Sequence, residues 1–212
     1  MGEARLGKAG ENMKYIIMCG RGNLRQLCWV NNETVVEHTI RLLRAKGIQD
    51  IAISSNNPAF EGFGVPVLHH ENVVWLDAFY PTDEPTCYLF GDVVFSPEAI
   101  NTIVDTETAD IEFFASAPPF SPEYLKSWAE PFAFKVQNVQ RFRECIEKTK
   151  KYYKEAKLRR AISWELWQVI KDTPLGKIDY TNYTVINDYT CDIDTEGDAK
   201  CFAQLARCKG GL

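Results

Sequence analysis

Two patterns of apolar and polar residues alternate in the first part of the chain: short apolar runs and longer stretches with helical spacing. Residues 15–18 and 51–54 are nearly continuous apolar runs with the length of buried strands. Between them, over residues 33–46, apolar side chains recur every three or four positions, as they do on the buried face of a helix. A strand, a helix and a second strand within about forty residues predict a βαβ unit, and hence a parallel sheet with a right-handed crossover.

The same two patterns continue along the rest of the sequence. They predict further strands at 65–68, 87–90, 111–115, 130–136 and 183–186, and helices around 73–79 and at 97–104, 138–160, 163–170 and 199–208. We therefore predict an α/β fold, with a Rossmann-like, doubly wound and mostly parallel sheet and an inserted α+β portion at about 116–180. Because no repeat or low-complexity segment interrupts this pattern, residues 13–212 are interpreted as one domain.

The first twelve residues differ from this domain because they are polar and carry no strand or helix periodicity. They also lack the apolar segment of a signal peptide. Residues 1–12 are therefore predicted to be a disordered extension or a mis-assigned start. The second interpretation follows from Gly10-Glu11, which can be encoded as GGAGAA, a ribosome-binding sequence just ahead of Met13.

Composition places the chain among ordinary globular proteins, since its 212 residues are 45% hydrophobic and 25% charged. The 24 Lys and Arg against 29 Asp and Glu give a net charge of −5, which argues against non-specific nucleic-acid binding. No apolar run approaches the roughly 20 residues that a membrane-spanning helix needs. The seven cysteines form no CxxC pair, so no disulfide framework or zinc ribbon is indicated and a cytoplasmic location is expected.

A glycine-rich turn follows the first predicted strand, at the end of the sheet where ligands of parallel sheets bind. Its sequence over residues 20–25 is Gly-Arg-Gly-Asn-Leu-Arg. Glycines let the backbone approach a ligand closely, while exposed N–H groups and two arginines suit phosphate oxygens. The turn matches neither GxxxxGK[ST] nor GxGxxG, so taken alone it is equally compatible with a plain strand-to-helix connection.

Acidic residues follow two other predicted elements. Gly91-Asp92 comes directly after the strand at 87–90, where a carboxylate would face the same crevice. Asp192 and Asp194 alternate along an extended segment, so their side chains fall on one side of it. Magnesium favours one or two carboxylates together with phosphate oxygens, which makes Asp92, Asp192 and Asp194 candidate ligands. Each feature alone is more often an ordinary turn or a solvated acidic loop.

Taken together and in this order, the three features resemble the nucleotidyltransferase family with the GT-A-like fold. That family includes sugar-phosphate nucleotidylyltransferases, cytidylyltransferases and molybdopterin guanylyltransferases. The resemblance extends from Met13 to about residue 205, with its motifs at 16–22, 30–40, 89–95 and 192–198. Residues 30–40 are similar to the family's V-N-G-x-P-V-I-E-H-T-I, and residues 192–198 to its D-I-D-T-P-E-D.

The resemblance implies a magnesium-dependent transfer of a nucleoside monophosphate from a nucleoside triphosphate to a phosphorylated sugar or alcohol, with release of pyrophosphate. It implies catalytic roles for Arg25, Asp92 and Asp194, with Asp92, Asp194 and Asp192 holding Mg²⁺. The residues it implies for nucleotide binding are Cys19, Gly20, Arg21, Gly22, Asn23, Asn72 and Asp77. The segment 71–78 loosely resembles choline-phosphate and sugar-phosphate cytidylyltransferases, which favours CTP and the synthesis of surface polysaccharide or glycoconjugate precursors.

Two departures from the family pattern keep alternative functions open. The family has the lysine of a Pro-Lys pair where this chain has Arg25, and the glycine-rich turn is about two residues shorter here. A lysine is a compact charge and an arginine a planar fork, so the exchange is not neutral at a phosphate, although Arg21 is placed to compensate. One alternative is a nucleotide- or sugar-phosphate-binding protein without turnover. Another is a glycosyltransferase, which the late position of Asp192 and Asp194 disfavours.

Basic residues in the second half of the chain are candidates for binding the acceptor. The candidate contacts to the acceptor phosphate are Lys135, on a predicted strand, and Arg159, near the end of a predicted helix. Arg160 is a further candidate. An ordinary surface lysine is the alternative for Lys135. Trp164 and Trp167 are interpreted as core or subunit-contact residues, so a homodimer is left open.

Overall fold

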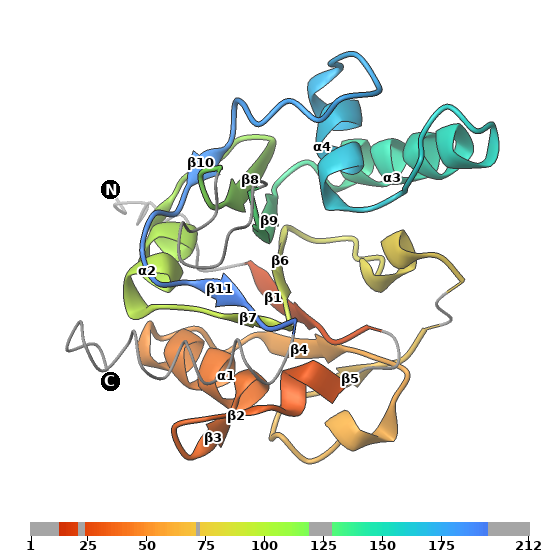
Figure 1. The fold of residues 1–212 in the computed structure, drawn as a ribbon. Coiled ribbons are helices and arrows are strands. Elements are labelled where there is room, and N and C mark those ends of the chain that lie inside the picture. The colour runs from red at the N-terminus through yellow and green to blue at the C-terminus, as the bar shows by residue number, and fades with distance from the viewer. Residues whose placement is uncertain (1–12, 21–23, 71–72, 119–128, 195–212) are drawn as a thin grey trace, which may run out of the picture.

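A seven-stranded sheet with the order β10-β8-β9-β6-β1-β4-β5 forms the centre of the molecule (Figure 1). The structure is a computed structural model that describes residues 13–20, 24–70, 73–118 and 129–194. The strands of this sheet are β1 (Lys14–Met18), β4 (Ile51–Ser54), β5 (Val67–Leu68), β6 (Thr86–Phe90), β8 (Ile111–Ala115), β9 (Pro131–Val136) and β10 (Thr184–Val185). All seven predicted strands are therefore confirmed, whereas the extension 1–12 and the predicted helix 199–208 lie outside the described residues.

The directions of the strands confirm a mostly parallel sheet. β1 pairs in parallel with β4 and β6, β4 with β5, and β8 with β10, whereas β9 runs antiparallel to both β6 and β8. The chain winds outward from β1 through β4 and β5, then returns to place β6 on the other side of β1. Such a reversal opens a crevice outside the carboxyl ends of the strands, which is where doubly wound folds bind ligands.

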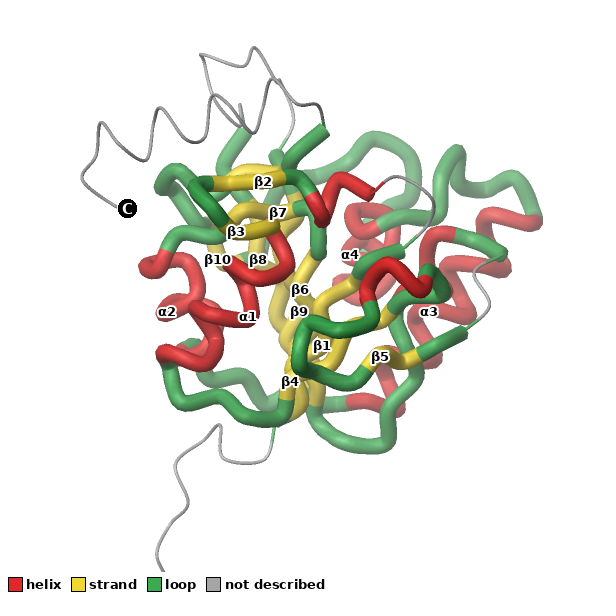
Figure 2. The backbone as a smooth tube through the Cα atoms, turned by 90° about the horizontal axis from the view of Figure 1, so that it is seen from below, coloured by secondary structure: helices red, strands yellow, loops and turns green. Residues whose placement is uncertain are grey.

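The inserted portion expected at 116–180 is not a separate unit. Its strand β9 lies inside the main sheet, hydrogen-bonded between β6 and β8. Its helices α3 (Val139–Lys154) and α4 (Ser163–Lys171) pack on each other and cover one face of the sheet (Figure 2). A single antiparallel strand within a parallel sheet is common in α/β folds, so this α+β portion extends the main sheet.

Helices cover both faces of the sheet. α1 (Val35–Ala45) and α2 (Pro97–Asp105) lie on the face opposite α3 and α4 (Figure 2). The main core lies between these layers and includes residues 15–18 of β1, of which Tyr15, Ile16 and Ile17 are fully buried. This arrangement explains why the run at 15–18 is apolar at every position, because a central parallel strand is covered on both sides.

The boundaries of α1 follow from local side-chain chemistry. The Thr34 hydroxyl accepts the Glu37 N–H at 3.2 Å, and the Glu37 carboxylate accepts the Thr34 N–H at 2.7 Å, which is a capping box. The helix ends where the Gly47 N–H donates to the Arg44 carbonyl and Gly47 adopts a φ of 83°. This left-handed conformation favours glycine, so the sequence marks the end of the helix correctly.

The predicted helix at 138–160 is too long, because α3 ends at Lys154. Ala156 adopts the left-handed conformation with a φ of 55°, and the Lys157 N–H donates to the Tyr152 carbonyl at 2.9 Å. This is the hydrogen bond of a Schellman motif formed without glycine. The missing glycine explains why the sequence shows no stop at this point.

Short elements connect the main ones. Three are 3-10 turns, at Leu24–Leu27, Pro58–Phe60 and Trp75–Ala78. Two small antiparallel ribbons pair β2 (Trp29–Val30) with β3 (Glu33–Thr34), and β7 (Val93–Val94) with β11 (Cys191–Asp192). Across the described ranges, none of the helices has the length and apolar character required to cross a bilayer.

Candidate active site

Gly91 brings the end of β6 against the end of β1. Its N–H donates to the Met18 carbonyl at 3.0 Å. A Cβ atom at Gly91 would lie 2.6 Å from the Met18 carbonyl oxygen and 2.8 Å from Cys19 Sγ, distances that real side chains do not adopt. Only glycine therefore fits here, and the close approach places the next residue, Asp92, at the switch point of the sheet.

The ribbon of β7 and β11 brings the late acidic residues to Asp92. Asp192 pairs with Val93 across this ribbon, and the Ile193 N–H donates to the Asp92 carbonyl oxygen at 2.7 Å. Two short strands thereby join segments that lie about one hundred residues apart in the sequence. The structure thus brings Asp92, Asp192 and Asp194 together, since all three line the same cavity.

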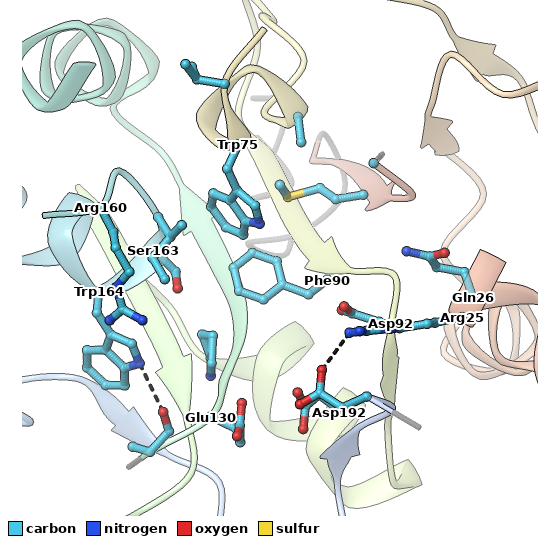
Figure 3. Close-up of a pocket in the computed structure, with 18 of the residues that line it drawn as sticks. Arg25, Gln26, Trp75, Phe90, Asp92, Glu130, Arg160, Ser163, Trp164 and Asp192 are labelled. Carbon is cyan, nitrogen blue, oxygen red and sulfur yellow. Dashed lines mark hydrogen bonds and ion pairs between the residues drawn. The ribbon is translucent and has the colours of Figure 1, made fainter. Parts of the chain in front are cut away.

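This cavity has a volume of about 780 Å³ and opens along the carboxyl edge of β1 and β6. On its carboxylate side lie Arg25, Gln26, Asp92, Asp192 and Asp194. On its aromatic side lie Glu130, Arg160, Ser163, Trp164 and Tyr180. Figure 3 shows Trp75 and Phe90 between Arg160 on one side and Asp92 on the other.

Negative charge is concentrated on the carboxylate side. The pKa of Asp92 is raised to about 6, mainly by burial and then by the nearby Asp192 and Asp194 carboxylates. A hydrogen bond from its own backbone and the charge of Arg25 oppose this rise. Arg25 Nη1 donates to Asp194 Oδ1 at 2.6 Å (Figure 3). One guanidinium thus faces three carboxylates, an arrangement that stabilises an additional cation.

The donor set of this side fits magnesium bound together with phosphate. Within the described ranges, no group of three or more His, Cys, Asp or Glu side chains forms a metal cage on its own. Magnesium rarely needs such a cage, because it keeps waters and binds one or two carboxylates plus substrate phosphate oxygens. The pKa of Asp92 is raised first by burial and then by the neighbouring carboxylates, and a bound divalent cation would offset both effects. Asp92, Asp192 and Asp194 are therefore the residues that would hold the metal.

The aromatic side contains one arginine held by a buried carboxylate. Arg160 Nε donates to Glu165 Oε1 at 3.1 Å, and the Glu165 side chain is 7% exposed. Trp164 is fixed by its Nε1–H, which donates to the Ala129 carbonyl at 3.0 Å. Of the two candidate arginines, Arg160 lines the cavity and Arg159 does not. The cause is the early end of α3, which changes the direction of the following segment.

The structure places Lys135 away from the cavity, which corrects its assignment to the acceptor. The Lys135 ammonium is buried and donates to the carbonyls of Ile103, Val104 and Thr106, at 3.0, 2.8 and 2.6 Å. These carbonyls end helix α2, where a positive charge is stabilised by the helix dipole. All three ammonium donors have partners, so Lys135 serves the fold.

Asp77 also has a structural role. Its carboxylate accepts the N–H groups of Val73 and Val74, both at 2.8 Å, and pairs with Lys150 at 2.9 Å. These contacts fix the 3-10 turn whose Trp75 and Ala78 line the cavity in place of Asp77. We expected Asp77 to bind the nucleotide, but in the structure it stabilises the turn that carries Trp75 and Ala78.

The remaining nucleotide-binding expectations divide into three groups. Gly20 lines the cavity, as predicted. Cys19 is fully buried behind it, and its N–H donates to the Ser54 carbonyl at 2.9 Å. The expectations for Arg21, Gly22, Asn23 and Asn72 lie outside the described residues.

Several cavity residues were not predicted from the sequence. They share an aromatic or polar side chain at the end of a strand or on a connecting turn, and they are Gln26, Phe90, Glu130 and Tyr180. Phe90 and Glu130 adjoin strands that the apolar runs predicted, so position at a strand end was the signal available for them. Gln26 and Tyr180 lie outside any periodic pattern, and nothing in the sequence marks them.

Comparison with known proteins bears on the fold. No protein-family model and no curated protein matches the sequence. Among solved structures, a CMP:2-keto-3-deoxy-manno-octonic acid synthetase in complex with CTP matches with a TM-score of 0.59 at 11% identity, over 93% of this chain and 99% of that one. The inositol-1-phosphate CTP transferase from T. maritima matches with a TM-score of 0.57 at 14% identity, over 96% and 98%.

A third match is the CTP:phosphocholine cytidylyltransferase from Streptococcus pneumoniae, with a TM-score of 0.51 at 15% identity, over 91% of this chain and 98% of that one. The chain has a nucleotidyltransferase fold. At these identities the likeness concerns the fold, and it spans nearly the full length of each chain. The nucleotidyltransferase fold predicted from the sequence motifs is thereby confirmed.

Proposed function

We propose that this protein is a magnesium-dependent nucleotidyltransferase that transfers a nucleoside monophosphate, preferably from CTP, to a phosphorylated sugar or alcohol. The observation that carries the proposal is the convergence of Asp92, Asp192, Asp194 and Arg25 at the switch point, inside one cavity. That position is where doubly wound folds bind nucleotides. The nucleotidyltransferase fold supports the same reaction, because the three solved structures named above are, by their names, CTP-using enzymes.

The reaction is an in-line displacement at the α-phosphorus. A phosphate oxygen of the acceptor forms the new bond, the bond between the α-phosphorus and the bridging oxygen breaks, and pyrophosphate leaves with that electron pair. Such chemistry depends on positioning and on neutralising charge, and it needs no covalent nucleophile on the protein. Bound Mg²⁺ would supply Lewis-acid stabilisation of the charge on the phosphate oxygens.

The residues of this chain divide these tasks between the two sides of the cavity. On the carboxylate side, Asp92 and Asp194 hold the cation, and Arg25 presents its guanidinium to the triphosphate. On the aromatic side, Arg160 binds an anionic group of the acceptor, with its orientation fixed by Glu165. Trp75 and Phe90, which lie between them, exclude water from the reacting groups (Figure 3).

A further part of the proposal is that the product is a nucleotide-activated precursor of surface polysaccharide or glycoconjugate. The size of the cavity supports a small acceptor, because about 780 Å³ has to admit the nucleotide and the acceptor together. An acceptor with one phosphate and a compact organic part fits this space best.

The test is a binding screen followed by a turnover assay. CTP, UTP, dTTP, GTP and ATP are each added with Mg²⁺ in a thermal-shift experiment, in which the largest rise in Tm is expected with CTP. Pyrophosphate release is then measured with a panel of phosphorylated sugars and alcohols, and we expect release that depends on both the acceptor and the metal. Binding without release would support a non-catalytic nucleotide-binding protein. The absence of any nucleotide-dependent shift would contradict both functions.

A further inference from the structure

The ion pair of Arg25 and Asp194 joins two parts of the chain at the position where a metal would be held. Arg25 lies on the 3-10 turn Leu24–Leu27, after β1, and Asp194 lies just beyond β11. Arg25 Nη1 and Asp194 Oδ1 are 2.6 Å apart, across 169 residues of sequence. The two side chains are 34% and 46% exposed, so both remain accessible from the cavity.

Among the described residues that line the carboxylate side, Arg25 supplies positive charge against the three aspartates. Among the described residues that line the cavity, the arginines are Arg25 and Arg160, and Figure 3 shows them on opposite sides. Arg25 also acts on Asp92, because its charge opposes the rise in pKa that burial and the neighbouring carboxylates cause. In the protein without nucleotide, the Arg25 guanidinium therefore supplies positive charge at the place where the metal ion would supply it.

A metal ion and Arg25 cannot both make their best contacts with Asp194. A divalent cation bound by Asp92 and Asp194 would take up the carboxylate oxygen that Arg25 now contacts. A guanidinium released from that oxygen has a ready partner, because its planar fork of donors matches phosphate oxygens. A lysine in the same place would present a single compact charge and could not span two acceptors as a fork does.

We infer that Arg25 holds Asp194 in the nucleotide-free protein and exchanges it for phosphate oxygens when the metal and nucleotide bind. The inference rests on the proposed function for the identity of the phosphate ligand. The exchange keeps the carboxylates balanced in both states. It also makes metal binding without nucleotide unfavourable, since the ion must then displace a paired guanidinium.

The consequence is that one substitution changes two affinities in opposite directions. Arg25→Ala removes a competitor for Asp194, so the metal alone binds more tightly, by about twofold to fivefold for a half-exposed ion pair. The same variant loses a phosphate contact, so CTP in the presence of Mg²⁺ binds more weakly, by about tenfold or more. A residue that only stabilised the fold would weaken both or change neither.

The experiment measures Mn²⁺ binding by electron paramagnetic resonance, with Mg²⁺ as competitor, in the absence of nucleotide. Wild-type protein is compared with Arg25→Ala and Arg25→Lys, and CTP binding is measured by calorimetry on the same samples. The matched control is Arg41→Ala, because Arg41 Nη2 also contacts a carboxylate, Glu33 Oε1, at 2.6 Å, and neither residue lines the cavity. We expect Arg41→Ala to leave the Mn²⁺ affinity unchanged and Arg25→Lys to fall between wild type and Arg25→Ala.

An unchanged or lower Mn²⁺ affinity in Arg25→Ala would overturn the inference, and so would the absence of Mn²⁺ binding in every protein tested. Circular dichroism of each variant shows that it is folded, and Arg25→Lys keeps the charge should the alanine variant be unstable. Failure of the proposed function has a different signature, because it removes nucleotide binding and pyrophosphate release from the wild type. The metal measurement itself requires neither nucleotide nor turnover.

Discussion

The two sides of the cavity each contain an arginine held by a carboxylate, but the two ion pairs are built differently. Arg25 contacts Asp194, whose side chain is 46% exposed, whereas Arg160 contacts Glu165, whose side chain is 7% exposed. A pair with an accessible carboxylate can be exchanged for a ligand, while a pair with a buried carboxylate fixes the arginine in one orientation. The comparison indicates that the carboxylate side changes partners during binding and that the aromatic side is preorganised.

The supporting elements differ in the same way. The aromatic side is carried by α4, whose Leu166 and Trp167 are buried in the main core. The carboxylate side depends on the ribbon of β7 and β11, which has only two residue pairs. Its Val93 packs in the main core, whereas Val94 and Cys191 pack in a small separate cluster with Val30 and Val35. The Arg25–Asp194 pair, which we expect to change partners on binding, is thus held by a short ribbon with few contacts, whereas Arg160 and Glu165 are held by a helix in the main core.

The largest effect is expected from removing the Asp92 carboxylate on the carboxylate side. We predict that Asp92→Ala lowers the rate of pyrophosphate release by more than ~10³-fold, because a metal ligand at the switch point is lost. The rate is measured under saturating CTP, Mg²⁺ and acceptor. Asp83→Ala is the control, since Asp83 has a side-chain exposure of 96% and pairs with Arg143 outside the cavity. Turnover near the wild-type rate in Asp92→Ala would refute the assignment of this side.

A smaller, more selective effect is expected on the aromatic side. We predict that Arg160→Ala raises the KM for the phosphorylated acceptor by about tenfold, with the KM for CTP nearly unchanged, because a charge-assisted contact to the acceptor is lost. Steady-state kinetics with each substrate varied in turn measures this split. Arg159→Ala provides a neighbouring control, because Arg159 is exposed and does not line the cavity. Equal changes in both KM values would show that the two sides do not divide the substrates as proposed.

The sequence predicted the sheet and the carboxylate side because these depend on local patterns. Apolar runs such as 15–18 mark strands that are buried on both faces, and Gly91-Asp92 marks a strand end where only glycine fits. The pairing of Asp192 with Val93 was not predictable from periodicity, since β7 and β11 are two residues long. The expectation that Asp192 and Asp194 lie near Asp92 came instead from the resemblance of the motifs to a known family.

The aromatic side was harder to predict because it depends on tertiary contacts. Arg160 enters the cavity only because α3 stops early, at an alanine in the left-handed conformation. Lys135 was assigned to the acceptor because a lysine on a strand suggests a ligand, whereas the carbonyls that bind it come from the end of α2. Neither the early end of α3 nor the contact of Lys135 with α2 is marked in the local sequence. Both depend on contacts between segments that are distant in the chain, and the sequence pattern does not show such contacts.

The smallest expected effect concerns the stability of the metal-free fold, and it compares a carboxylate on each side of the cavity. Because the pKa of Asp92 is raised to about 6 in the folded protein, ionising it destabilises the metal-free fold. The folded state binds more protons than the unfolded state between the ordinary carboxyl pKa of 3.8 and about 6. Stability from this group is therefore complete at low pH and is lost as the pH rises through about 6. Asp92→Asn removes this loss and should stabilise the protein at pH 7.5 by on the order of 1–2 kcal/mol.

Urea unfolding in the presence of EDTA, at pH 7.5 and at pH 5, tests this prediction. The variant should be more stable than wild type at pH 7.5, and the difference should shrink at pH 5, where Asp92 is largely protonated. Asp83→Asn is the exposed control and should show no such dependence, because no partner on the carboxylate side repels it. Glu165→Gln gives the contrast on the aromatic side, where loss of the carboxylate breaks a pair with Arg160 and should destabilise the fold. Equal stability of Asp92→Asn and wild type at pH 7.5 would show that the ionised Asp92 carboxylate is not destabilised by burial and by its carboxylate neighbours. The argument that this side of the cavity favours a cation would then fail.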